Sequence, residues 1–495
     1  MQAMLNSLLP DHHLPAISVS GIAYDSRKVK SGDLFLATRG DQVDGRQFVN
    51  NVADTAAAVL CESPYQSVCG NDFEVRDLSA HKGMIASRFY QEPSKSLKVI
   101  AVTGTNGKTS VSHYVAQALS LLQQPCGVVG TLGAGLNSDL EDVGMTTPDA
   151  VDLQRMLFEM RGKGADAVCL EASSHGLVQG RLNGTRIETA IFTNISRDHL
   201  DYHSDFDHYK EAKKQLFEWP DLKHAVINLD DEFGEALANE MIARLEIPSR
   251  KMDEQSVGCG TGCITFSLKR PDADVYCDSI EYKSTGVAAL IIYQGHALPL
   301  ESKLLGGFNL SNLLAVVSTL LVEGVPFAQA ILTVSQLNNV KGRMDLLACE
   351  GKPTVVIDYA HTPDALEKAL LATRQHADGA VYCVMGCGGD RDKGKRPQMG
   401  AVAVRIADHA FVTSDNPRTE NPAEIVEDIV AGIAGNNRIT VEVDRATAIV
   451  QALKKAKPAD LVLIAGKGHE PYQEVNGQKL PYSDYAVVEK YFSEQ

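Results

Sequence analysis

Apolar residues in this chain occur mainly in short runs, and each run is followed by a cluster of glycine, small polar or charged residues. Segments with apolar positions at helical spacing separate the runs, which lie at residues 99–103, 168–170, 190–195, 355–357 and 409–413. A strand buried on both faces reads as a continuous apolar run, and a parallel neighbour needs a crossover helix. The pattern therefore predicts an α/β fold with mainly parallel sheets. Within residues 235–305, alternating positions such as 288–293 predict an additional antiparallel portion.

Two interruptions of this pattern predict the domain boundaries. A helical run breaks at Pro93, just before the apolar run at 99–103. The helical stretch that follows Asn309 ends near Leu337, and a fresh strand begins soon after it. We therefore predict three domains, which is what 495 residues suggest at roughly 150 residues per domain. They span residues 1–92, 93–337 and 338–495.

The charge balance limits the choice of partners. The chain has 47 Lys and Arg against 63 Asp and Glu, a formal net charge of −16, which disfavours broad contact with nucleic acid or anionic lipid. Its first ten residues lack the basic and apolar segments of a secretion signal, and no run of about 18 apolar residues predicts a membrane span. We expect a cytoplasmic protein.

The ten cysteines are scattered along the chain. The nearest pairs, Cys259 with Cys263 and Cys383 with Cys387, have neither the spacing of a zinc ribbon nor a second half. We interpret the cysteines as free and mostly buried thiols of a reducing compartment.

A candidate phosphate-binding loop follows the first apolar run of the predicted central domain. Residues 99–103 lead into Gly104-Thr105-Asn106-Gly107-Lys108-Thr109-Ser110, and a helical period follows. Such a loop brings backbone N–H groups to a phosphate, while its lysine reaches the phosphate oxygens and its threonine suits Mg²⁺. Val102 stands where the full nucleotide-loop pattern has glycine, so a plain turn is the alternative interpretation.

Two further runs end in residues suited to a divalent cation. The run at 168–170 leads to Glu171-Ala172-Ser173-Ser174-His175-Gly176, and the run at 190–195 leads to a segment that contains His199 and His203. A carboxylate and an imidazole at neighbouring strand ends would hold a hard cation and an oxygen-rich substrate. Each of these residues taken alone favours a solvated loop residue over a metal ligand. Their combination with the phosphate loop reverses that preference and favours a metal site.

Two later motifs add candidate contacts to a nucleotide. Gly306-Gly307-Phe308-Asn309-Leu310-Ser311-Asn312 offers backbone and side-chain amides, and Arg343 follows Lys341-Gly342. A guanidinium suits the charge that spreads over a transferring phosphoryl group. Helix capping and a surface arginine are the local alternatives.

Taken in order, these motifs resemble those of the Mur ligase family, ATP-dependent enzymes that extend the peptide of peptidoglycan precursors. Further motifs that carry the resemblance are Asp25-Ser26-Arg27, Gly32-Asp33-Leu34-Phe35, Asp358-Tyr359-Ala360-His361-Thr362-Pro363 and Asp415-Asn416-Pro417-Arg418. The resemblance covers nearly the whole chain.

The resemblance implies a uridine-nucleotide domain, a central P-loop-type ATPase domain and a Rossmann-like C-terminal domain that binds the incoming amino acid. It also implies a reaction: ATP phosphorylates a substrate carboxylate, an amine attacks the acyl phosphate, and an amide, ADP and phosphate result. This activity would serve peptidoglycan synthesis, cell-wall biogenesis, cell shape and cell division. We expect a monomer.

Two alternatives remain at this point. A folylpolyglutamate synthetase-like ligase shares the last two domains but lacks the uridine domain, so residues 1–92 argue against it. A P-loop kinase or nucleotide switch would explain the glycine loop, yet it leaves the third domain without a task.

The family's functional residues can be carried over by position. The implied magnesium ligands are Thr109, Glu171, His199 and Lys213, the last as a carbamate. The implied catalytic residues are Lys108, Glu171, His199, Lys213 and Arg343. The implied ATP contacts are Gly104 to Ser110, Asn309, Asn312, Arg343, Asp358 and His361. The implied contacts to the uridine nucleotide and its peptide are Tyr24, Ser26, Asp41, Gln42, Val43, Thr146, Thr147, Ser173, Gln179 and Arg181. Without the resemblance, Lys213 reads as a helical surface lysine.

The segment Asp415 to Arg418 resembles the signature of family members that add meso-2,6-diaminopimelate to UDP-N-acetylmuramoyl-L-alanyl-D-glutamate. Arg418 can clamp the distal carboxylate of that amino acid, which L-lysine, the alternative acceptor, does not have. The other implied contacts are Arg391, Asn416, Pro417, Gly466 and Glu470. A turn with a surface arginine is the local alternative.

Overall fold

The computed structural model describes residues 1–40, 43–136, 139–196, 202–245, 262–433, 435 and 437–494. These form two compact units: residues 1–276 with 314–333, and residues 277–313 with 334–495. No helix in the described ranges has the length and apolar character needed to cross a membrane. The three predicted domain boundaries stay a prediction.

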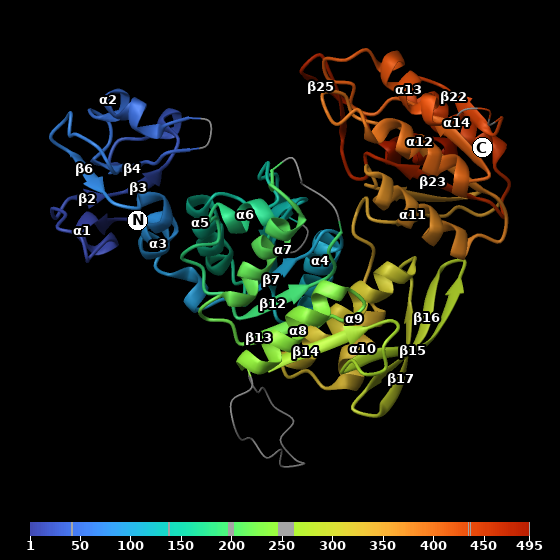
Figure 1. The fold of residues 1–495 in the computed structure, drawn as a ribbon, viewed down its shortest axis with the longest axis horizontal. Coiled ribbons are helices and arrows are strands. Elements are labelled where there is room, and N and C mark those ends of the chain that lie inside the picture. Colours follow the sequence, from blue (N-terminus) through green and yellow to red (C-terminus); the bar gives the residue numbers. More distant parts are fainter. Residues whose placement is uncertain are drawn as a thin grey trace. The chain divides into compact units, whose positions relative to one another are not determined.

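The first unit begins with a small parallel sheet (Figure 1). Its strand order is β3-β4-β5-β6, formed by β3 (Gly21–Ala23), β4 (Asp33–Ala37), β5 (Ala58–Glu62) and β6 (Asp72–Val75). A short antiparallel pair, β1 (Ala3–Met4) with β2 (Ser18–Val19), and helices α1 (Leu5–Leu8), α2 (Val49–Val52) and α3 (Leu78–Phe89) accompany it. Leu34 and Leu36 lie in one apolar cluster and Phe35 in another, because successive strand residues face opposite sides.

The larger sheet of this unit carries the phosphate loop. Among the strands that lie wholly within this unit, the order is β10-β9-β8-β11-β7-β12-β13-β14. The strands are β7 (Lys98–Thr103), β8 (Cys126–Gly130), β9 (Gly133–Leu136), β10 (Asp139–Glu141), β11 (Ala167–Glu171), β12 (Thr189–Phe192), β13 (His224–Asn228) and β14 (Gly262–Ser267). The helices are α4 (Lys108–Leu121), α5 (Ala150–Gly162), α6 (Ser174–Val178), α7 (Phe206–Lys214) and α8 (Glu232–Leu245). From β8 to β14 in this order, each strand pairs in parallel with the next, as predicted.

Strand β15 (Val275–Lys283) begins in the first unit and continues into the second, which contains the hairpin β16 (Gly286–Tyr293) and β17 (His296–Ser302). This hairpin is antiparallel and confirms the predicted antiparallel portion, although α8 and the parallel strand β14 fall within the same stretch. The helical stretch after Asn309 is two helices, α9 (Gly307–Val322) and α10 (Phe327–Ser335). Gly324, with a φ of 85°, lies between them.

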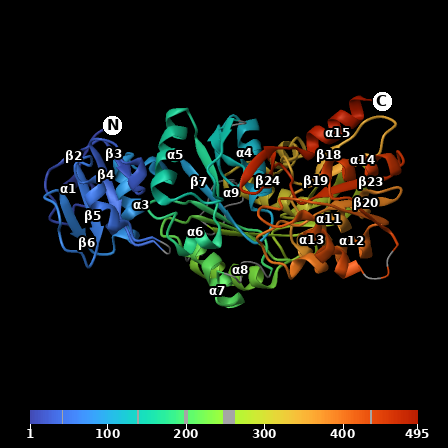
Figure 2. The same cartoon turned by 90° about the horizontal axis from the view of Figure 1, so that it is seen from above.

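The second unit contains a six-stranded, mostly parallel sheet with the order β18-β19-β23-β20-β21-β22. The strands are β18 (Asp345–Leu347), β19 (Thr354–Asp358), β20 (Val381–Met385), β21 (His409–Val412), β22 (Ile439–Val441) and β23 (Leu461–Ala465). Figure 2 shows α11 (Pro363–His376), α12 (Lys395–Ile406) and α13 (Pro422–Val430) on one face, and α14 (Arg445–Lys455) and α15 (Asp484–Ser493) on the other. A hairpin of β24 (Tyr472–Val475) and β25 (Gln478–Pro481) follows β23.

The nine described cysteines are free thiols, as predicted, and Cys259 lies outside the described residues. Burial raises the pKa of Cys383 and of Cys387 to about 12. Both thiols therefore stay protonated at neutral pH and act as small apolar groups.

Gly83 gives a test of how α3 packs. A Cβ on Gly83 would overlap the backbone carbonyl of Asn183, which cannot move away as a flexible side chain can. We expect Gly83→Ala to lower the free energy of unfolding by about 1–3 kcal/mol, the usual range for overpacking. Gly162→Ala in α5, where a Cβ would meet open space, should be neutral or stabilise by up to about 1 kcal/mol. Urea unfolding of both variants provides the measurement, and equal effects would contradict the packing described.

Candidate active site

The phosphate loop joins β7 to α4 in the predicted order. Gly104 and Gly107 have φ values of 147° and 89°, a region that non-glycine residues rarely adopt. Lys108 is the first residue of α4, and its Nζ donates to the carbonyl oxygens of Gly104 at 2.8 Å and Thr105 at 3.0 Å. The lysine thus folds back over the loop, where its ammonium can face a bound phosphate.

Residues that follow β12 hold the loop in this shape. The backbone N–H of Asn106 donates to Asn194 Oδ1 at 3.1 Å, and Asn194 Nδ2 donates to the carbonyl of Asn106 at 3.1 Å. Thr193 Oγ1 also donates to the Asn106 carbonyl, at 2.6 Å. The sequence predicted a strand over 190–195, but β12 ends at Phe192 because Thr193 and Asn194 are used to hold the loop.

Lys213, at the end of α7, lies against the same loop. Its side chain is 1% exposed, and its Nζ donates to the Gly104 carbonyl at 2.9 Å. The ammonium also lies 4.5 Å from the centre of the Tyr209 ring. The local alternative of a helical surface lysine is therefore wrong, because α7 turns Lys213 towards the loop.

Glu171, the last residue of β11, is the centre of a buried group of oxygen atoms. Its Oε2 accepts from Thr109 Oγ1 at 3.0 Å, and its Oε1 accepts from the backbone N–H of Thr131 at 2.8 Å. Thr131 Oγ1 reaches Glu171 Oε2 at 3.2 Å and lies 3.0 Å from Thr146 Oγ1. Sequence reasoning missed Thr131, which follows β8 and carries no motif of its own. This donor set suits a hard cation.

One of the predicted metal ligands, His199, lies outside the described residues. Asp41 and Gln42, which were predicted to contact the uridine nucleotide, also lie outside them. Within the described ranges, no three His, Cys, Asp or Glu side chains form a group that could hold a metal ion. Thr109, Glu171 and Lys213 nevertheless all border the phosphate loop.

The residues predicted to contact the sugar and peptide lie together beside Glu171. Thr147 Oγ1 donates to the Glu171 carbonyl at 2.7 Å and lies 2.9 Å from Ser173 Oγ. Arg181 donates to the Thr147 carbonyl at 2.8 Å, and its Nε donates to Gln179 Oε1 at 2.9 Å. The hydroxyl groups of Thr147 and Ser173, called the hydroxyl row below, thus lie next to the guanidinium of Arg181. This arrangement suits sugar hydroxyls and a diphosphate.

Two neighbours of these residues come from the segment after β12: His203, which the sequence analysis named with His199 as suited to a cation, and Tyr202, which it did not assign a role. His203 is buried and its Nε2 lies 2.9 Å from Ser174 Oγ, while the ring of Tyr202 lies 4.0 Å from that of His175. These contacts fix the start of α6, where Ser173 caps the helix by accepting from the N–H of Gly176.

The predicted uridine residues lie in the small sheet and its loops. Tyr24 follows β3, Ser26 begins a short helical turn, and Val43 is exposed. The hydroxyl of Tyr24 donates to Asp152 on α5 at 2.5 Å, and burial raises its pKa, with Asp152 adding to the effect. The phenol group of Tyr24 is thus hydrogen-bonded to α5, a helix that accompanies the larger sheet.

In the second unit, the predicted nucleotide residues Asn309 and Asn312 lie in the first two turns of α9. Asn309 is fully buried, and its Nδ2 donates to the Leu305 carbonyl at 2.9 Å. His376, at the end of α11, holds the loop just before it: the N–H of Gly306 donates to His376 Nε2 at 2.8 Å, and His376 Nδ1 lies 2.5 Å from the Lys283 carbonyl. Sequence reasoning missed His376, which lies 64 positions after Asn312 and carries no motif.

Arg343 and Asp358 lie in one cluster of the second unit. Arg343 lies over the Tyr359 ring at 4.8 Å. Asp358, the last residue of β19, accepts from the N–H groups of Met344 at 2.8 Å and Ala360 at 2.9 Å. Burial raises the pKa of Asp358, and Arg343 opposes that effect. His361 is nearby in sequence and lies 4.9 Å from Tyr359, ring to ring.

The predicted acceptor residues come from two loops of the second unit. Asp415 to Arg418 follow β21, and Gly466 and Glu470 follow β23. Asn416 Nδ2 donates to Glu470 Oε2 at 2.8 Å, which joins the loops. Gly466 has a φ of 116°, and a Cβ there would lie 2.5 Å from Asp415 Oδ2. The φ value favours glycine at this position, and a larger residue would also displace the Asp415 carboxylate.

Arg418 is held by two contacts that leave part of its guanidinium available. Its Nη1 donates to the Gly389 carbonyl at 2.7 Å, and its Nε lies 3.1 Å from Glu474 Oε2 on β24. The interpretation of Arg418 as a surface arginine is wrong, because its side chain is only 22% exposed. Arg391 is exposed and follows the same Gly388-Gly389 segment.

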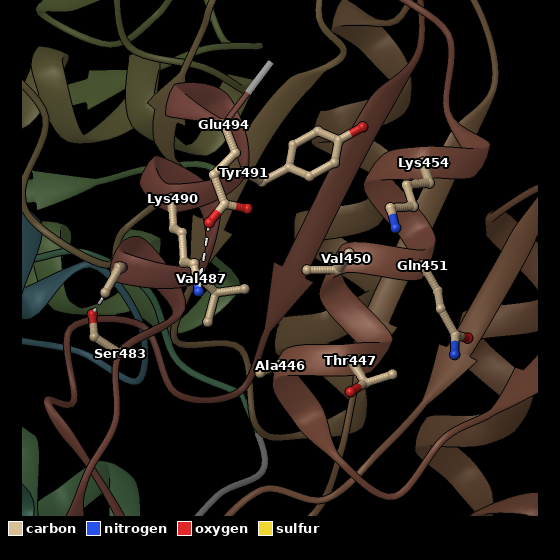
Figure 3. A pocket seen from close by; sticks show the side chains of 11 residues that line it. Ala446, Thr447, Val450, Gln451, Lys454, Ser483, Val487, Lys490, Tyr491 and Glu494 are labelled. Carbon is tan, nitrogen blue, oxygen red and sulfur yellow. Dashed lines mark hydrogen bonds and ion pairs between the residues drawn. The ribbon is translucent and has the colours of Figure 1, made fainter.

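A surface groove lies elsewhere in the second unit. Figure 3 shows it between α14 and α15, with Val450, Val487 and Tyr491 in its wall. Its volume is about 810 Å³. It contains none of the predicted site residues, so the size of a groove does not identify the site in this chain.

Three family models match the chain. They are described as the Mur ligase family catalytic domain, at residues 18–88, the Mur ligase middle domain, at 102–320, and the Mur ligase glutamate ligase domain, at 342–468.

Curated relatives match over nearly the full length. A protein of Ectopseudomonas mendocina named UDP-N-acetylmuramoyl-L-alanyl-D-glutamate–2,6-diaminopimelate ligase is 46% identical over 489 residues, which cover 98% of this chain and 97% of that protein. A protein of Coxiella burnetii with the same name is 42% identical over 479 residues and covers 96% of each chain.

Solved structures agree. A structure titled as the same 2,6-diaminopimelate ligase is 37% identical and has a TM-score of 0.74, covering 100% of this chain and 99% of that one. A folylpolyglutamate synthase from Mycobacterium tuberculosis is 16% identical and has a TM-score of 0.62, covering 84% of this chain and 96% of that one. The second likeness shows a shared fold alone.

The His376 contacts predict a pH dependence of stability. Burial lowers the pKa of His376, since Nε2 must stay unprotonated to accept from Gly306. The unfolded chain, with an ordinary histidine pKa of about 6.5, takes up a proton at a higher pH than the folded chain. The stability contributed by His376 is therefore full above that value and falls as pH drops towards the lower folded pKa.

We expect the difference in unfolding free energy between wild type and His376→Gln to shrink between pH 7.5 and 5.5, as measured by urea unfolding. The matched variant His296→Gln, at an exposed position on β17, should differ from wild type by the same amount at each pH. A constant difference for His376→Gln would rule out this account.

Proposed function

The chain belongs to the Mur ligase family, and we propose that it is the ATP-dependent ligase that adds meso-2,6-diaminopimelate to UDP-N-acetylmuramoyl-L-alanyl-D-glutamate in peptidoglycan precursor synthesis. The observation that carries the choice of acceptor is the cluster in the second unit where the loop of Arg418 meets the loop of Glu470, joined by Asn416 Nδ2, which donates to Glu470 Oε2 at 2.8 Å. Relatives of that name at 46% identity support the same reaction. The small N-terminal sheet, matched by a family model of its own, disfavours a folylpolyglutamate ligase.

The reaction needs positive charge more than it needs a nucleophile from the protein. Phosphoryl transfer from ATP to a substrate carboxylate brings anions together, so catalysis is mainly positioning and charge stabilisation. We assign Lys108 and Arg343 to the phosphoryl oxygens, and Asn309, Asn312, Asp358 and His361 to the rest of the nucleotide. The amino group of the acceptor then attacks the acyl phosphate, and phosphate leaves.

Mg²⁺ is the proposed metal, and the donor set beside the phosphate loop fits it. Thr109 Oγ1 and Glu171 supply oxygen ligands, and His199 is proposed as a third ligand on family grounds. When bound, Mg²⁺ would neutralise charge on the phosphate oxygens. The half-buried Thr131 donates to Glu171 from its backbone and its hydroxyl group, and so orients the carboxylate without adding charge.

Lys213 is proposed to act as a carbamate. Lys213 and Lys108 both donate to the Gly104 carbonyl. A second ammonium at this place would repel Mg²⁺, whereas a carbamate is an anion with two oxygen donors. Its nearly complete burial and its place against Gly104 support this assignment, because a shielded lysine loses its proton more readily than an exposed one.

The substrate side is assigned to the hydroxyl row and the small sheet. Thr146, Thr147 and Ser173 suit the sugar and peptide, while Gln179 and Arg181 suit the diphosphate. Tyr24, Ser26 and the segment Asp41-Gln42-Val43 are assigned to the uridine end, with Tyr24 acting as a wall since its hydroxyl is used by Asp152. We also propose that the chain works as a monomer in the cytoplasm.

The acceptor can be identified from ADP release. With ATP, Mg²⁺ and the nucleotide dipeptide, we expect release with meso-diaminopimelate and little with L-lysine or without an amine. Arg418→Asn, chosen because asparagine tolerates the φ of 52° at this position, should lower kcat/KM for diaminopimelate by about tenfold or more, the cost of a lost charged hydrogen bond.

Arg405→Ala, which removes an exposed arginine paired with Glu367 at 2.9 Å, is the matched control and should behave as wild type. Equal turnover with lysine would refute the acceptor assignment, and release without any amine would refute the ligase assignment.

The carbamate can be observed without an activity assay. We expect wild-type protein equilibrated with ¹³C-bicarbonate to show a protein-bound carbamate resonance by ¹³C NMR, and Lys213→Arg to lack it. Lys214→Arg, at the neighbouring lysine that pairs with Glu240 at 2.9 Å, should keep the resonance. A signal that persists in Lys213→Arg would assign the modification to another residue.

A further inference from the structure

Lys467 is a buried cation at the centre of the proposed acceptor pocket. Its side chain has no solvent exposure. Its Nζ donates to Asn416 Oδ1 at 2.8 Å and to Glu470 Oε2 at 3.0 Å, and it lies 3.7 Å from Asp415 Oδ1. One ammonium therefore contacts three side chains that come from two different loops.

The backbone of both loops is held by other groups. Arg445 on α14 donates to the Ala465 carbonyl at 3.0 Å, directly before Gly466, and pairs with Asp484 at 2.8 Å. Gln473 on β24 donates to the Asp415 carbonyl at 2.6 Å. Other groups therefore also hold the loops, whereas the contacts of Lys467 described above are with side chains.

The charges of the pocket show what Lys467 adds. Lys467 lies 3.0 Å from Glu470 Oε2 and 3.7 Å from Asp415 Oδ1, and Arg418 pairs with Glu474 at 3.1 Å. Three carboxylates therefore meet two cations. Without Lys467 they would meet Arg418 alone, so Lys467 cancels one of two excess negative charges. Because its ammonium is buried, water screens this effect only weakly.

The two candidate acceptors differ in charge at the end that enters this pocket. The distal head of meso-diaminopimelate is a zwitterion, with an ammonium and a carboxylate and no net charge. The side chain of L-lysine ends in an ammonium alone, with a net charge of plus one. Excess negative charge in the pocket favours the lone cation, so the positive charge of Lys467 shifts the preference towards the zwitterion.

We propose that Lys467 is a positioning residue that sets acceptor selectivity: it holds Asn416 and Glu470 in place and cancels one carboxylate charge, so the pocket takes a zwitterionic amino-acid head in preference to a lone ammonium. This proposal rests on the proposed function, since it concerns the acceptor of the same reaction. Removal of the charge should weaken diaminopimelate binding and favour lysine.

The test compares acceptor selectivity in wild type and in two neutral variants, Lys467→Met and Lys467→Gln. The glutamine variant retains a donor for Asn416 and serves if the methionine variant does not fold; thermal melting and ADP affinity report folding. For each protein, kcat/KM is measured with meso-diaminopimelate and with L-lysine, and KM is measured for ATP and for the nucleotide dipeptide.

We expect the ratio of kcat/KM for diaminopimelate to that for lysine to fall about tenfold or more in a neutral variant, equivalent to about 1.4 kcal/mol. The loss should appear in the KM for diaminopimelate, while the KM values for ATP and nucleotide stay within about twofold. Lys467→Arg keeps the charge and should retain more of the ratio than Lys467→Met. The control Lys368→Met, at an exposed lysine paired with Asp364 at 2.8 Å, should leave the ratio unchanged.

The outcomes separate this proposal from the proposed function. Wild-type protein that does not use diaminopimelate would refute the function itself. Wild-type protein that does use it, with an unchanged ratio in a folded neutral variant, would refute the role of Lys467. A uniform rise of every KM with a constant ratio would show a structural role only and would also overturn the proposal.

Discussion

A parallel sheet covered by helices on both faces leaves only the ends of its strands for polar chemistry, and both large sheets of this chain obey that constraint. Strands β7, β11 and β23 are almost completely buried along their length. Glu171 is the last residue of β11, the phosphate loop follows β7, and Gly466 follows β23. Ligands of open α/β sheets bind beyond these carboxyl ends. The position of the chemistry in each unit therefore follows from how its core is packed.

The same constraint explains why much of the site could be predicted from sequence. An apolar run that stops at polar residues marks both a strand and its functional end, so the phosphate loop, Glu171 and Asp415 to Arg418 could be placed on strand ends without a structure. The three-domain boundaries were set by Pro93 and the break after Leu337, which are weaker signals and remain untested. The exact ends of strands could not be predicted in this way. Thr193 and Asn194 were predicted to be strand residues, but their side chains hold the phosphate loop instead.

Residues that act through distant partners could not be predicted in this way. His376 lies at the end of α11 and holds Gly306, 70 positions away, and nothing in its neighbours distinguishes it from a surface histidine. Lys467 stands within Gly466-Lys467-Gly468, a segment whose motif directs attention to its glycines and to Glu470. Such roles depend on which loops meet, and that is fixed by the strand order β19-β23-β20-β21 rather than by local sequence.

The buried charges of the second unit point to one further consequence of this packing. Arg445 and Asp484 are both fully buried and neutralise each other behind the acceptor loops, while Lys467 is neutralised by side chains that line the pocket itself. A buried ion costs several kcal/mol unless it is paired, so Lys467 requires Glu470 and Asn416 to stay in place before any acceptor arrives. The pocket is thereby preorganised, and an incoming amino acid is selected by its fit to fixed charges. Acceptor selectivity of this kind follows from the fixed positions of the side chains around Lys467.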